Sequence, residues 1–277
     1  MLLASIDVRV FADAEVSLPH PNAYLLYSLV LGLIHESNPA LAETVHAPAK
    51  YKPVTVSTLY GCGKRSGETI HIPKLKEARF RISTIGKDLY EAVSTPLFQR
   101  LTSKGYLRIG NTDFHVLDVF VEPDEDGRRG SRGIVTNFPE LLQIGATSAT
   151  VKLRFHSPTS FRQRGRNLPV PLPKQVFDGL QRRWEHFSPI ALPCSITEEV
   201  YDDLVVSQLS LRSRIWKTPK TTSIGSVGYC TYTLLGNHGP EICRSLHTLA
   251  AFAFFAGIGH RTTMGMGQCS TPSLRLQ

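Results

Sequence analysis

The pattern of hydrophobic and polar positions predicts strands and helices in mixed order along the first half of the chain. Residues 2–10 alternate as a strand does, and residues 22–36 have the closely spaced apolar positions of a mostly buried helix. A second short helix is expected after Asn38-Pro39. Strands are further expected at 53–60, 79–85 and 106–121, and a helix at 88–101. The main order is strand, helix, strand, strand, helix, strand, as in a ferredoxin-like unit.

The same order recurs in the second half of the chain. Strands are expected at 149–155, 205–216 and 226–235, helices at 173–187 and 241–256, and a closing strand near the C-terminus. The region 123–146, which begins with a polar, glycine-rich stretch, is expected to be a linker or a hairpin. We therefore expect an α+β fold of two tandem ferredoxin-like domains, residues 1–122 and 147–277.

Composition and charge narrow the class of protein. Of the 277 residues, 42% are hydrophobic, which is enough for a substantial core. The net charge of +8 and the pI near 9.3 favour a polyanionic partner, although a modest basic excess also occurs in proteins that bind nothing acidic. The five cysteines are widely spaced and form no C-x-x-C pair, which indicates neither a zinc site nor a disulfide framework and fits a reducing cytoplasm.

Membrane and metal-dependent classes are disfavoured. The N-terminal residues lack a basic leader and a cleavable apolar segment. The longest apolar run, residues 246–258, contains His247 and is too short to span a bilayer. No set of Asp, Glu and His residues has the recurrent spacing of a metal site. We expect a cytoplasmic protein without a metal, a cofactor or a membrane partner.

A glycine-rich segment near the C-terminus, residues 257–267, brackets a basic, hydroxyl-bearing tip between two Gly-x-Gly pairs. Glycines allow positive φ and close approach of a ligand, so successive N–H groups can receive an anion. The expected phosphate-binding residues are Gly257, Gly259, His260, Arg261, Thr262, Gly265 and Gly267. The segment matches neither a P-loop nor the dinucleotide fingerprint. A glycine-rich hairpin without any ligand is the structural alternative.

A second basic segment carries Arg162, Arg164 and Arg166 among aromatic and hydroxyl side chains. This mixture suits phosphate contacts and base stacking, and a solvated loop is the alternative. Arg182-Arg183, on an expected helix, is interpreted as ordinary surface charge.

The candidate catalytic residues lie around the end of the first helical region. His46 precedes Lys52 by six residues, and Tyr27 lies on the preceding helix. A histidine can exchange a proton near neutral pH, and a lysine can stabilise charge that develops on a phosphate. One histidine near one lysine is a weak signal, so a histidine in a surface loop is the alternative.

Three segments together resemble the CRISPR-associated endoribonucleases of the Cas six family, which cut precursor CRISPR RNA within its repeats. They are the glycine loop with the apolar helix before it, residues 38–57 with His46 and Lys52, and residues 155–177. These segments span nearly the whole chain. The resemblance implies two tandem ferredoxin-like domains of the RNA-recognition type, in agreement with the pattern above.

The resemblance also implies roles for individual residues. His46 matches the catalytic histidine of the family and Lys52 the lysine that accompanies it. The position aligned with the family's tyrosine is Leu31, so Tyr27 is a substitute candidate, or the pair works without a tyrosine. His35 is the backup general base. The implied reaction needs no metal: a 2′-hydroxyl attacks the adjacent phosphate and leaves 2′,3′-cyclic phosphate and 5′-hydroxyl ends.

Other functions remain open at this point. A non-catalytic RNA-binding scaffold subunit of a CRISPR effector complex shares the core and the glycine loop, but has no need of the segment with His46 and Lys52. A general nucleic-acid binder would show no preference for repeats, and a metal-dependent nuclease would be inactive in EDTA. The expected partner is CRISPR repeat RNA, as precursor and as mature product, with other effector subunits as further candidates. A monomer or a homodimer is expected.

Overall fold

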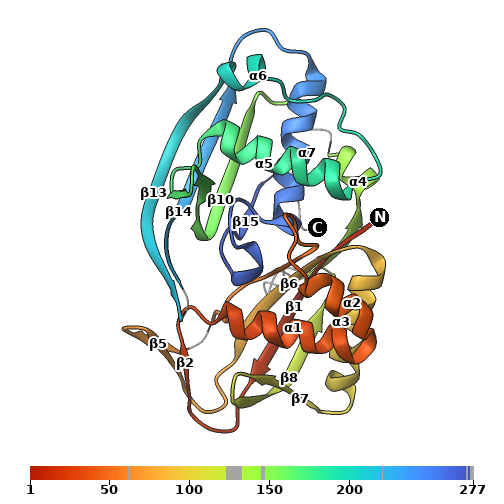
Figure 1. The fold of residues 1–277 in the computed structure, drawn as a ribbon, viewed down its shortest axis with the longest axis vertical. Coiled ribbons are helices and arrows are strands. Elements are labelled where there is room, and N and C mark those ends of the chain that lie inside the picture. Colours follow the sequence, from red (N-terminus) through yellow and green to blue (C-terminus); the bar gives the residue numbers. More distant parts are fainter. Residues whose placement is uncertain (62, 123–132, 145–146, 220, 273, 275–277) are drawn as a thin grey trace.

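The computed structural model describes residues 1–61, 63–122, 133–144, 147–219, 221–272 and 274. The fold is mixed α+β, as expected, and is built on two curved antiparallel sheets, one in the lower and one in the upper half of Figure 1. The chain forms the lower half first and then the upper half, and the two halves meet along a broad junction.

The first sheet has β1 at its centre. Its strand order is β3-β6-β1-β8-β7, and β9 pairs with the start of β1. The strands are β1 (Leu2–Phe11), β3 (Val54–Val56), β6 (Ala78–Ile85), β7 (Tyr106–Ile109), β8 (Thr112–Phe120) and β9 (Ile134–Asn137). The helices of this half are α1 (Ala23–Ser37), α2 (Pro39–His46) and α3 (Lys87–Thr102). β1 is buried along nearly its whole length because helices cover both faces of the sheet.

The second sheet has the order β13-β14-β10-β15. Its strands are β10 (Thr150–Thr159), β13 (Leu204–Thr218), β14 (Thr221–Leu234) and β15 (Cys269–Ser270). Helices α5 (Pro173–Phe187) and α7 (Pro240–Ala256) pack on it, and α6 (Glu198–Asp203) leads into β13. The expected helices at 173–187 and 241–256 are therefore confirmed, whereas the closing strand is only two residues long.

Several elements were not expected from the sequence. A small sheet of β2 (Val16–Pro19), β4 (Lys64–Ser66) and β5 (Thr69–Ile72) projects from the first half, and β11 (Phe161–Gln163) pairs with β12 (Arg166–Leu168). The region 123–146 contains β9 and α4 (Phe138–Leu142). Phe138 lies in the hydrophobic core of the second half, so this part belongs to the packed fold. Residues 123–132 and 145–146 of the expected linker lie outside the described residues.

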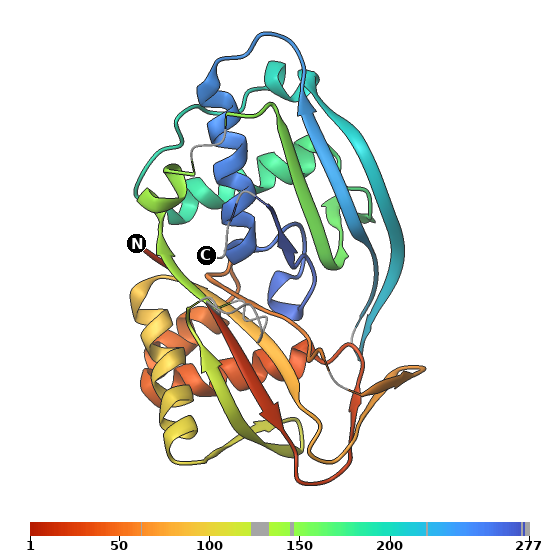
Figure 2. The ribbon, with the colours of Figure 1, turned by 180° about the vertical axis from the view of Figure 1, so that it is seen from behind.

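Helix α7 joins the two halves. All of its residues from Ser245 to Ala256 are buried, as in a helix that protein surrounds on every side. It packs on α5, β10 and β15 and also on β1, β3 and β6 of the first sheet (Figure 2). Arg81 of β6 stands with its guanidinium 4.1 Å from the ring centre of Phe254 and donates a hydrogen bond to the Oε1 atom of Gln268. The buried guanidinium of Arg81 thus reaches across the junction and donates to a hydrogen-bond acceptor in the second half.

The hairpin of β13 and β14 makes the second connection. Its tip reaches the first half, where the ammonium of Lys217 lies 2.6 Å from the carboxylate of Glu68. Next to it, Trp216 is 4% exposed and is buried together with Ala23 of α1 and Met266 of the glycine loop. The start of α1, the hairpin tip and the glycine loop therefore converge on one place.

Candidate active site at the junction of the two halves

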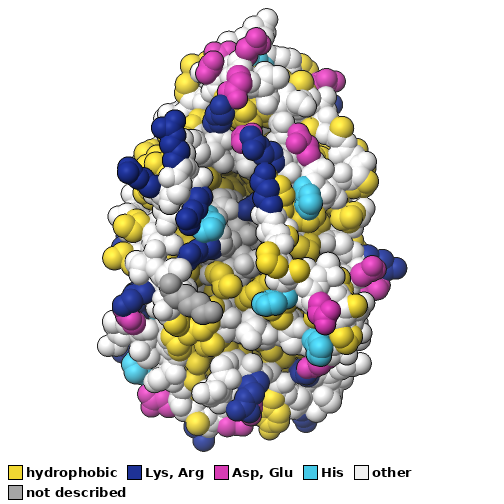
Figure 3. Space-filling model, viewed as in Figure 1, with side chains coloured by type: hydrophobic (Ala, Val, Ile, Leu, Met, Phe, Trp, Pro, Cys, Tyr) yellow, Lys and Arg dark blue, Asp and Glu magenta, His cyan; other side chains and the backbone are white. Residues whose placement is uncertain are grey.

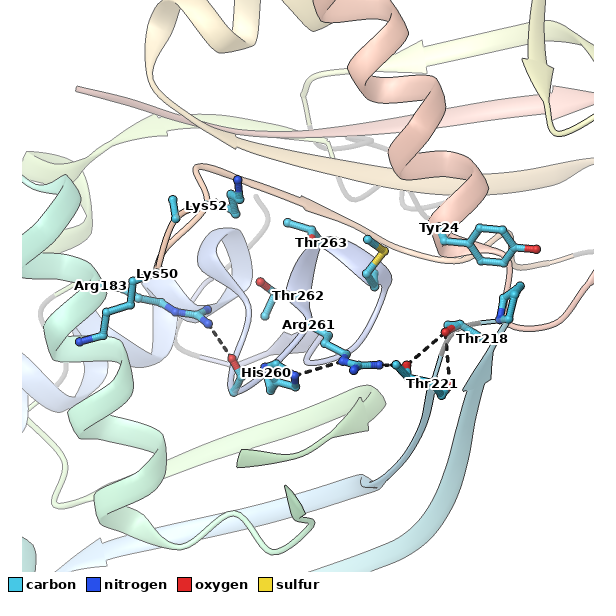
Figure 4. Close-up of a pocket in the computed structure, with 14 residues that line it drawn as sticks. Tyr24, Lys50, Lys52, Arg183, Thr218, Thr221, His260, Arg261, Thr262 and Thr263 are labelled. Atoms are coloured by element: carbon cyan, nitrogen blue, oxygen red, sulfur yellow. Dashed lines mark hydrogen bonds between the residues drawn. The ribbon is translucent and has the colours of Figure 1, made fainter. Parts of the chain in front are cut away.

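A cavity of about 790 Å³ lies where these elements converge (Figure 4). Its walls come from α1, the segment after α2, α5, the β13–β14 tip and the glycine loop. The lining residues are Tyr24, Ala49, Lys50, Lys52, Arg183, Thr218, Pro219, Thr221, Gly259, His260, Arg261, Thr262, Thr263 and Met264.

The charged side chains that line this cavity are cationic. Lys50, Lys52, Arg183 and Arg261 line it, and none of the described lining residues is acidic. Figure 3 shows Lys and Arg side chains gathered around a hollow on this face of the molecule. Cationic groups at close quarters favour a polyanionic ligand such as a phosphodiester chain.

His46 is the last residue of α2 and does not itself line the cavity. Its side chain is exposed. At the other end of the helix, the Asn38 side chain caps α2 by accepting a hydrogen bond from the Leu41 amide at 3.0 Å, and the helix begins at Pro39. Two residues separate His46 from Ala49 in the cavity wall, which keeps their Cα atoms within about 11 Å of each other.

Lys52 holds the end of this helix. Its ammonium donates hydrogen bonds to the carbonyl oxygens of Val45 at 2.7 Å, His46 at 3.3 Å and Ala47. Burial lowers the pKa of Lys52 below its ordinary value. A cation at the C-terminus of a helix also opposes the negative end of the helix dipole. The structure therefore brings Lys52 and the backbone of His46 together, with the Lys52 ammonium bound to backbone rather than free in the cavity.

The two tyrosines of α1 differ in their surroundings. Tyr27 is 8% exposed and packs in the hydrophobic core of the first half, where burial raises its pKa. Tyr27 is not among the residues that line the cavity, whereas Tyr24, one helical turn earlier, is. The two tyrosines are three residues apart on a helix whose residues are mostly apolar, so the spacing alone did not separate them. His35 is exposed near the other end of α1 and does not line the cavity.

The glycines of the loop are required by close packing. Gly257, Gly259, Gly265 and Gly267 have φ between 68° and 83°. A Cβ on Gly257 would stand 2.7 Å from the Thr262 side chain, and Cβ atoms on Gly259 and Gly267 would overlap the backbone carbonyls of neighbouring segments. Larger residues are thus excluded on steric grounds alone.

Several backbone amides of the glycine loop donate hydrogen bonds to carbonyl oxygens within the protein. The amide of Ile258 donates to the Gly267 carbonyl at 2.9 Å and that of Gly267 to the Pro158 carbonyl at 3.1 Å. The His260 amide donates to the Ser160 carbonyl at 2.8 Å. These three amides are therefore occupied, and the loop lines the cavity with Gly259 and residues 260–264, so an anion site at this loop stays a prediction.

Arg183 anchors the loop from α5. Its guanidinium donates hydrogen bonds to the carbonyls of Ala256 and Gly257 at 2.7 Å. It also donates to the carbonyl of Gly259 at 2.6 Å, a hydrogen bond drawn in Figure 4. Burial lowers the pKa of Arg183 to about 10, which still leaves it charged at neutral pH. The interpretation of Arg183 as surface charge is wrong, whereas its neighbour Arg182 is exposed, as expected. The periodicity of α5 could have distinguished the two arginines, because Arg183 follows Val176 by seven residues and Leu180 by three and so lies on the buried face.

His260 and Arg261 form a hydrogen-bonded pair at the loop tip. The Arg261 Nε atom donates to Nε2 of His260 at 3.0 Å, and the guanidinium also donates to the Thr221 hydroxyl. Burial, followed by the charges of Arg261, Arg162 and Arg183, lowers the pKa of His260. His260 is thus held as a neutral acceptor, which aims Arg261 along the cavity toward the hairpin tip.

The arginine-rich segment forms a hairpin rather than an irregular loop. Arg164 and Gly165 take positive φ at its two-residue turn, as a type I′ turn requires. All three arginines are exposed, and Arg162 lines a smaller pocket beside the cavity. Arg164 and Arg166 line neither space.

Within the part of the chain that the structure describes, no group of three or more His, Cys, Asp or Glu side chains is arranged to hold a metal ion. Across the same residues, no helix has both the length and the apolar character needed to cross a membrane.

Comparison with known families gives two matches along the chain. Residues 17–120 match a family model described as CRISPR-associated protein Cas6, N-terminal. Residues 153–269 match a model described as CRISPR-associated endoribonuclease Cas6. The two matches include α1, α2 and the Lys52 segment in the first half, and α5, α7 and the glycine loop in the second.

Individual relatives agree with these matches. A CRISPR-associated endoribonuclease Cas6 of Methanocaldococcus jannaschii is 28% identical over 125 residues, which are 43% of this chain and 45% of that protein. A solved Cas6 product complex is 28% identical with a TM-score of 0.77, and a solved Cas6 substrate mimic complex is 27% identical with a TM-score of 0.72. In both comparisons the match covers 98% of this chain and 99% of the other.

A Thermus thermophilus Cas6 at 23% identity shares the fold, with a TM-score of 0.69 over 98% of each chain. The agreement of both family models, the curated relative and the solved structures leads to one conclusion: this chain belongs to the Cas6 family of CRISPR-associated proteins.

Proposed function

We propose that this protein is a metal-independent endoribonuclease that cuts precursor CRISPR RNA within the repeat. The observation that carries the proposal is the contact between Lys52 and the His46 carbonyl, at 3.3 Å, on the edge of a cavity lined by cations. The backbone at the end of α2 is thereby held at the edge of a site suited to a phosphodiester, and the exposed His46 side chain extends from it. Membership of the Cas6 family, and solved relatives in product and substrate mimic complexes, support RNA as the ligand.

The two halves correspond in this proposal to two tandem ferredoxin-like domains, residues 1–122 and 147–277. In each half the principal elements follow the order strand, helix, strand, strand, helix, strand. The active site then lies at the junction, with His46 from the first domain and the glycine loop from the second.

The reaction uses the RNA's own nucleophile. The 2′-oxygen attacks the adjacent phosphorus while its proton passes to a base, and the bond from phosphorus to the 5′-oxygen breaks as that oxygen gains a proton. The ends formed are a 2′,3′-cyclic phosphate and a 5′-hydroxyl. His46 acts as the general base or acid, a role worth about 10²- to 10⁴-fold in rate. The alignment of attacking and leaving oxygens in the cavity contributes as well.

Lys52 acts mainly by positioning His46, since its ammonium is bound to the carbonyls at the end of α2. The charge that develops on the phosphate is then offset by Lys50 and Arg261, which line the cavity from opposite halves. Arg162, Arg164 and Arg166 extend the basic track along the RNA. Tyr24 replaces Tyr27 as the tyrosine nearest to the reaction.

The test is cleavage of repeat RNA from the protein's own genome, in EDTA, by the wild type and by His46→Ala. We expect the variant to lose at least about a hundredfold in cleavage rate while its affinity for RNA stays within about twofold. His35→Ala, an exposed histidine at the other end of the same helical region, is the matched control and should cleave normally. RNA with a 2′-deoxy substitution at the cut should bind and remain intact.

Each alternative gives a different result. Normal cleavage by His46→Ala together with inactive His35→Ala would move the general base to His35. Binding of repeat RNA by the wild type without any cleavage would favour a scaffold subunit. Cleavage that stops in EDTA would contradict the metal-independent mechanism.

A further inference from the structure

A second, smaller pocket of about 340 Å³ opens beside the cavity. The two spaces share Lys50, Arg183, Gly259 and His260 as walls. The smaller pocket is otherwise enclosed by Tyr51, Phe161, Arg162, Gln175, Asp178 and several apolar residues of α5 and the glycine loop. A polymer bound in the cavity can therefore place one unit in this pocket.

Two aromatic rings give the pocket flat, apolar walls. Phe161 of β11 is 5% exposed, so its position is fixed by the core of the second half. Tyr51 is supported from behind by the ring of His186, whose centre lies 5.4 Å away. The Lys50 ammonium stands 5.1 Å from the centre of the Tyr51 ring. Rings of this kind offer stacking surfaces to unpaired nucleobases.

The polar groups of the pocket suit a base better than a phosphate. Asp178 and Gln175 lie one turn apart on α5, and one oxygen of Asp178 accepts from Arg182 at 3.0 Å. Lys50, Arg162 and Arg183 in the same wall can contact neighbouring phosphates, while the carboxylate can accept hydrogen bonds from the exocyclic amino groups of a base. Among the described residues, the Oε1 atom of Gln175 has no hydrogen-bond partner although it is buried. Rotation of this amide toward a ligand would satisfy it.

We propose that this pocket receives the base of one unpaired nucleotide next to the scissile phosphate, and that Gln175 and Asp178 select a base with an exocyclic amino group. The inference rests on the proposed function, since the larger cavity must hold the phosphate. Adenine, cytosine and guanine carry such a group and uracil does not. The pocket thus supplies sequence preference beside a cavity whose other contacts are to the backbone.

The experiment is an abasic scan. Repeat RNA with a 2′-deoxy substitution at the cut, which binds without being cleaved, is made with the base removed from each nucleotide near the cut in turn. Its dissociation constant is measured with the wild type, Gln175→Ala and Gln99→Ala. Gln99 is an exposed glutamine on α3, remote from both pockets, and serves as the matched control.

We expect one abasic position to weaken binding to the wild type by about tenfold. Replacing that base by uracil should weaken binding too. Gln175→Ala should bind intact RNA more weakly than the wild type does. When the same base is removed from the RNA, this variant should lose little further affinity, because the substitution and the base removal delete the same interaction. Gln99→Ala should behave as the wild type with every RNA.

Two results would overturn the pocket assignment. One is that the wild type binds every abasic RNA as tightly as intact RNA. The other is that Gln175→Ala lowers the affinity for all RNAs by the same factor, as the loss of a purely structural residue would. Cleavage of unmodified repeat RNA by the wild type is measured in parallel. If the wild type cleaves but the scan fails, the pocket is wrong and the nuclease assignment stands; if it does not cleave, the proposed function itself fails.

Discussion

At the scale of single residues, His260 is held in its neutral form by its neighbours. Arg261 donates to its Nε2 atom, and burial and three arginines lower its pKa. Protonation would remove the acceptor and place another positive charge beside Arg261 and Arg183. Protonation of His260 would therefore remove one of the contacts that hold the tip of the glycine loop.

This arrangement predicts how stability depends on pH. Because the pKa of His260 is lower in the folded than in the unfolded protein, the unfolded state binds more protons below about pH 6.5, and the free energy of unfolding falls as pH decreases through that range. His20 and His247 shift in the same direction. Urea unfolding between pH 7.5 and pH 5 should show a shallower fall for His260→Gln than for the wild type. An identical slope for the two proteins would contradict the burial of His260 as a neutral group.

At the scale of elements, α5 sets the position of the glycine loop. Arg182 and Arg183 are neighbours in sequence but lie about 100° apart around the helix, so one faces solvent and the other faces the loop. Arg183 reaches three carbonyls at the end of α7 and in the loop. Helix α5 thereby fixes both the loop and the wall that the two pockets share.

We expect Arg183→Met to lower the free energy of unfolding by about 2 kcal/mol or more, since it leaves three carbonyls without their charged donor. Affinity for RNA should fall as well, because the loop loses its anchor. Lys174→Met is the matched control on the same helix: its ion pair with Glu198 is exposed, so its loss should cost under about 1 kcal/mol. Thermal melting and RNA binding of both variants give the comparison, and equal effects would refute the anchoring role.

At the scale of the whole molecule, the site exists because the two halves are locked together. His46, the proposed general base, comes from α2, and the glycine loop comes from the chain after α7, some 200 residues later. Arg81, which is 3% exposed, contacts Phe254 and Gln268 across the junction. A shift between the halves would change the shape of the cavity, whose walls come from both halves.

A double-mutant cycle tests this connection. Arg81→Met and Gln268→Ala should each destabilise the protein, and the double variant should be less destabilised than the sum of the two, with a coupling energy of about 1–3 kcal/mol. Cleavage should fall in both single variants because the geometry of the site depends on the junction. Additive effects on the free energy of unfolding would show that the contact across the junction carries no energy of its own.

Much of the fold could be predicted from local patterns. The helix at 173–187 follows from its 3.6-residue periodicity and its initial proline, and α2 from the cap at Asn38. The small sheet of β2, β4 and β5 was missed because its strands are three or four residues long, too short for a periodic signal. β9 was missed because it is a short segment that gains its partner, β1, from the far end of the sequence.

The sequence by itself determined the element types, the basic character and the resemblance that led to the Cas6 family. These depend on residue spacing along the chain and on short motifs. Only the tertiary structure decided that Tyr24 rather than Tyr27 lines the cavity, that Lys52 is bound to the end of α2, and that Arg183 holds the glycine loop. Such roles depend on which backbone carbonyls and neighbouring segments come within hydrogen-bond distance, and chain segments far apart in sequence supply them.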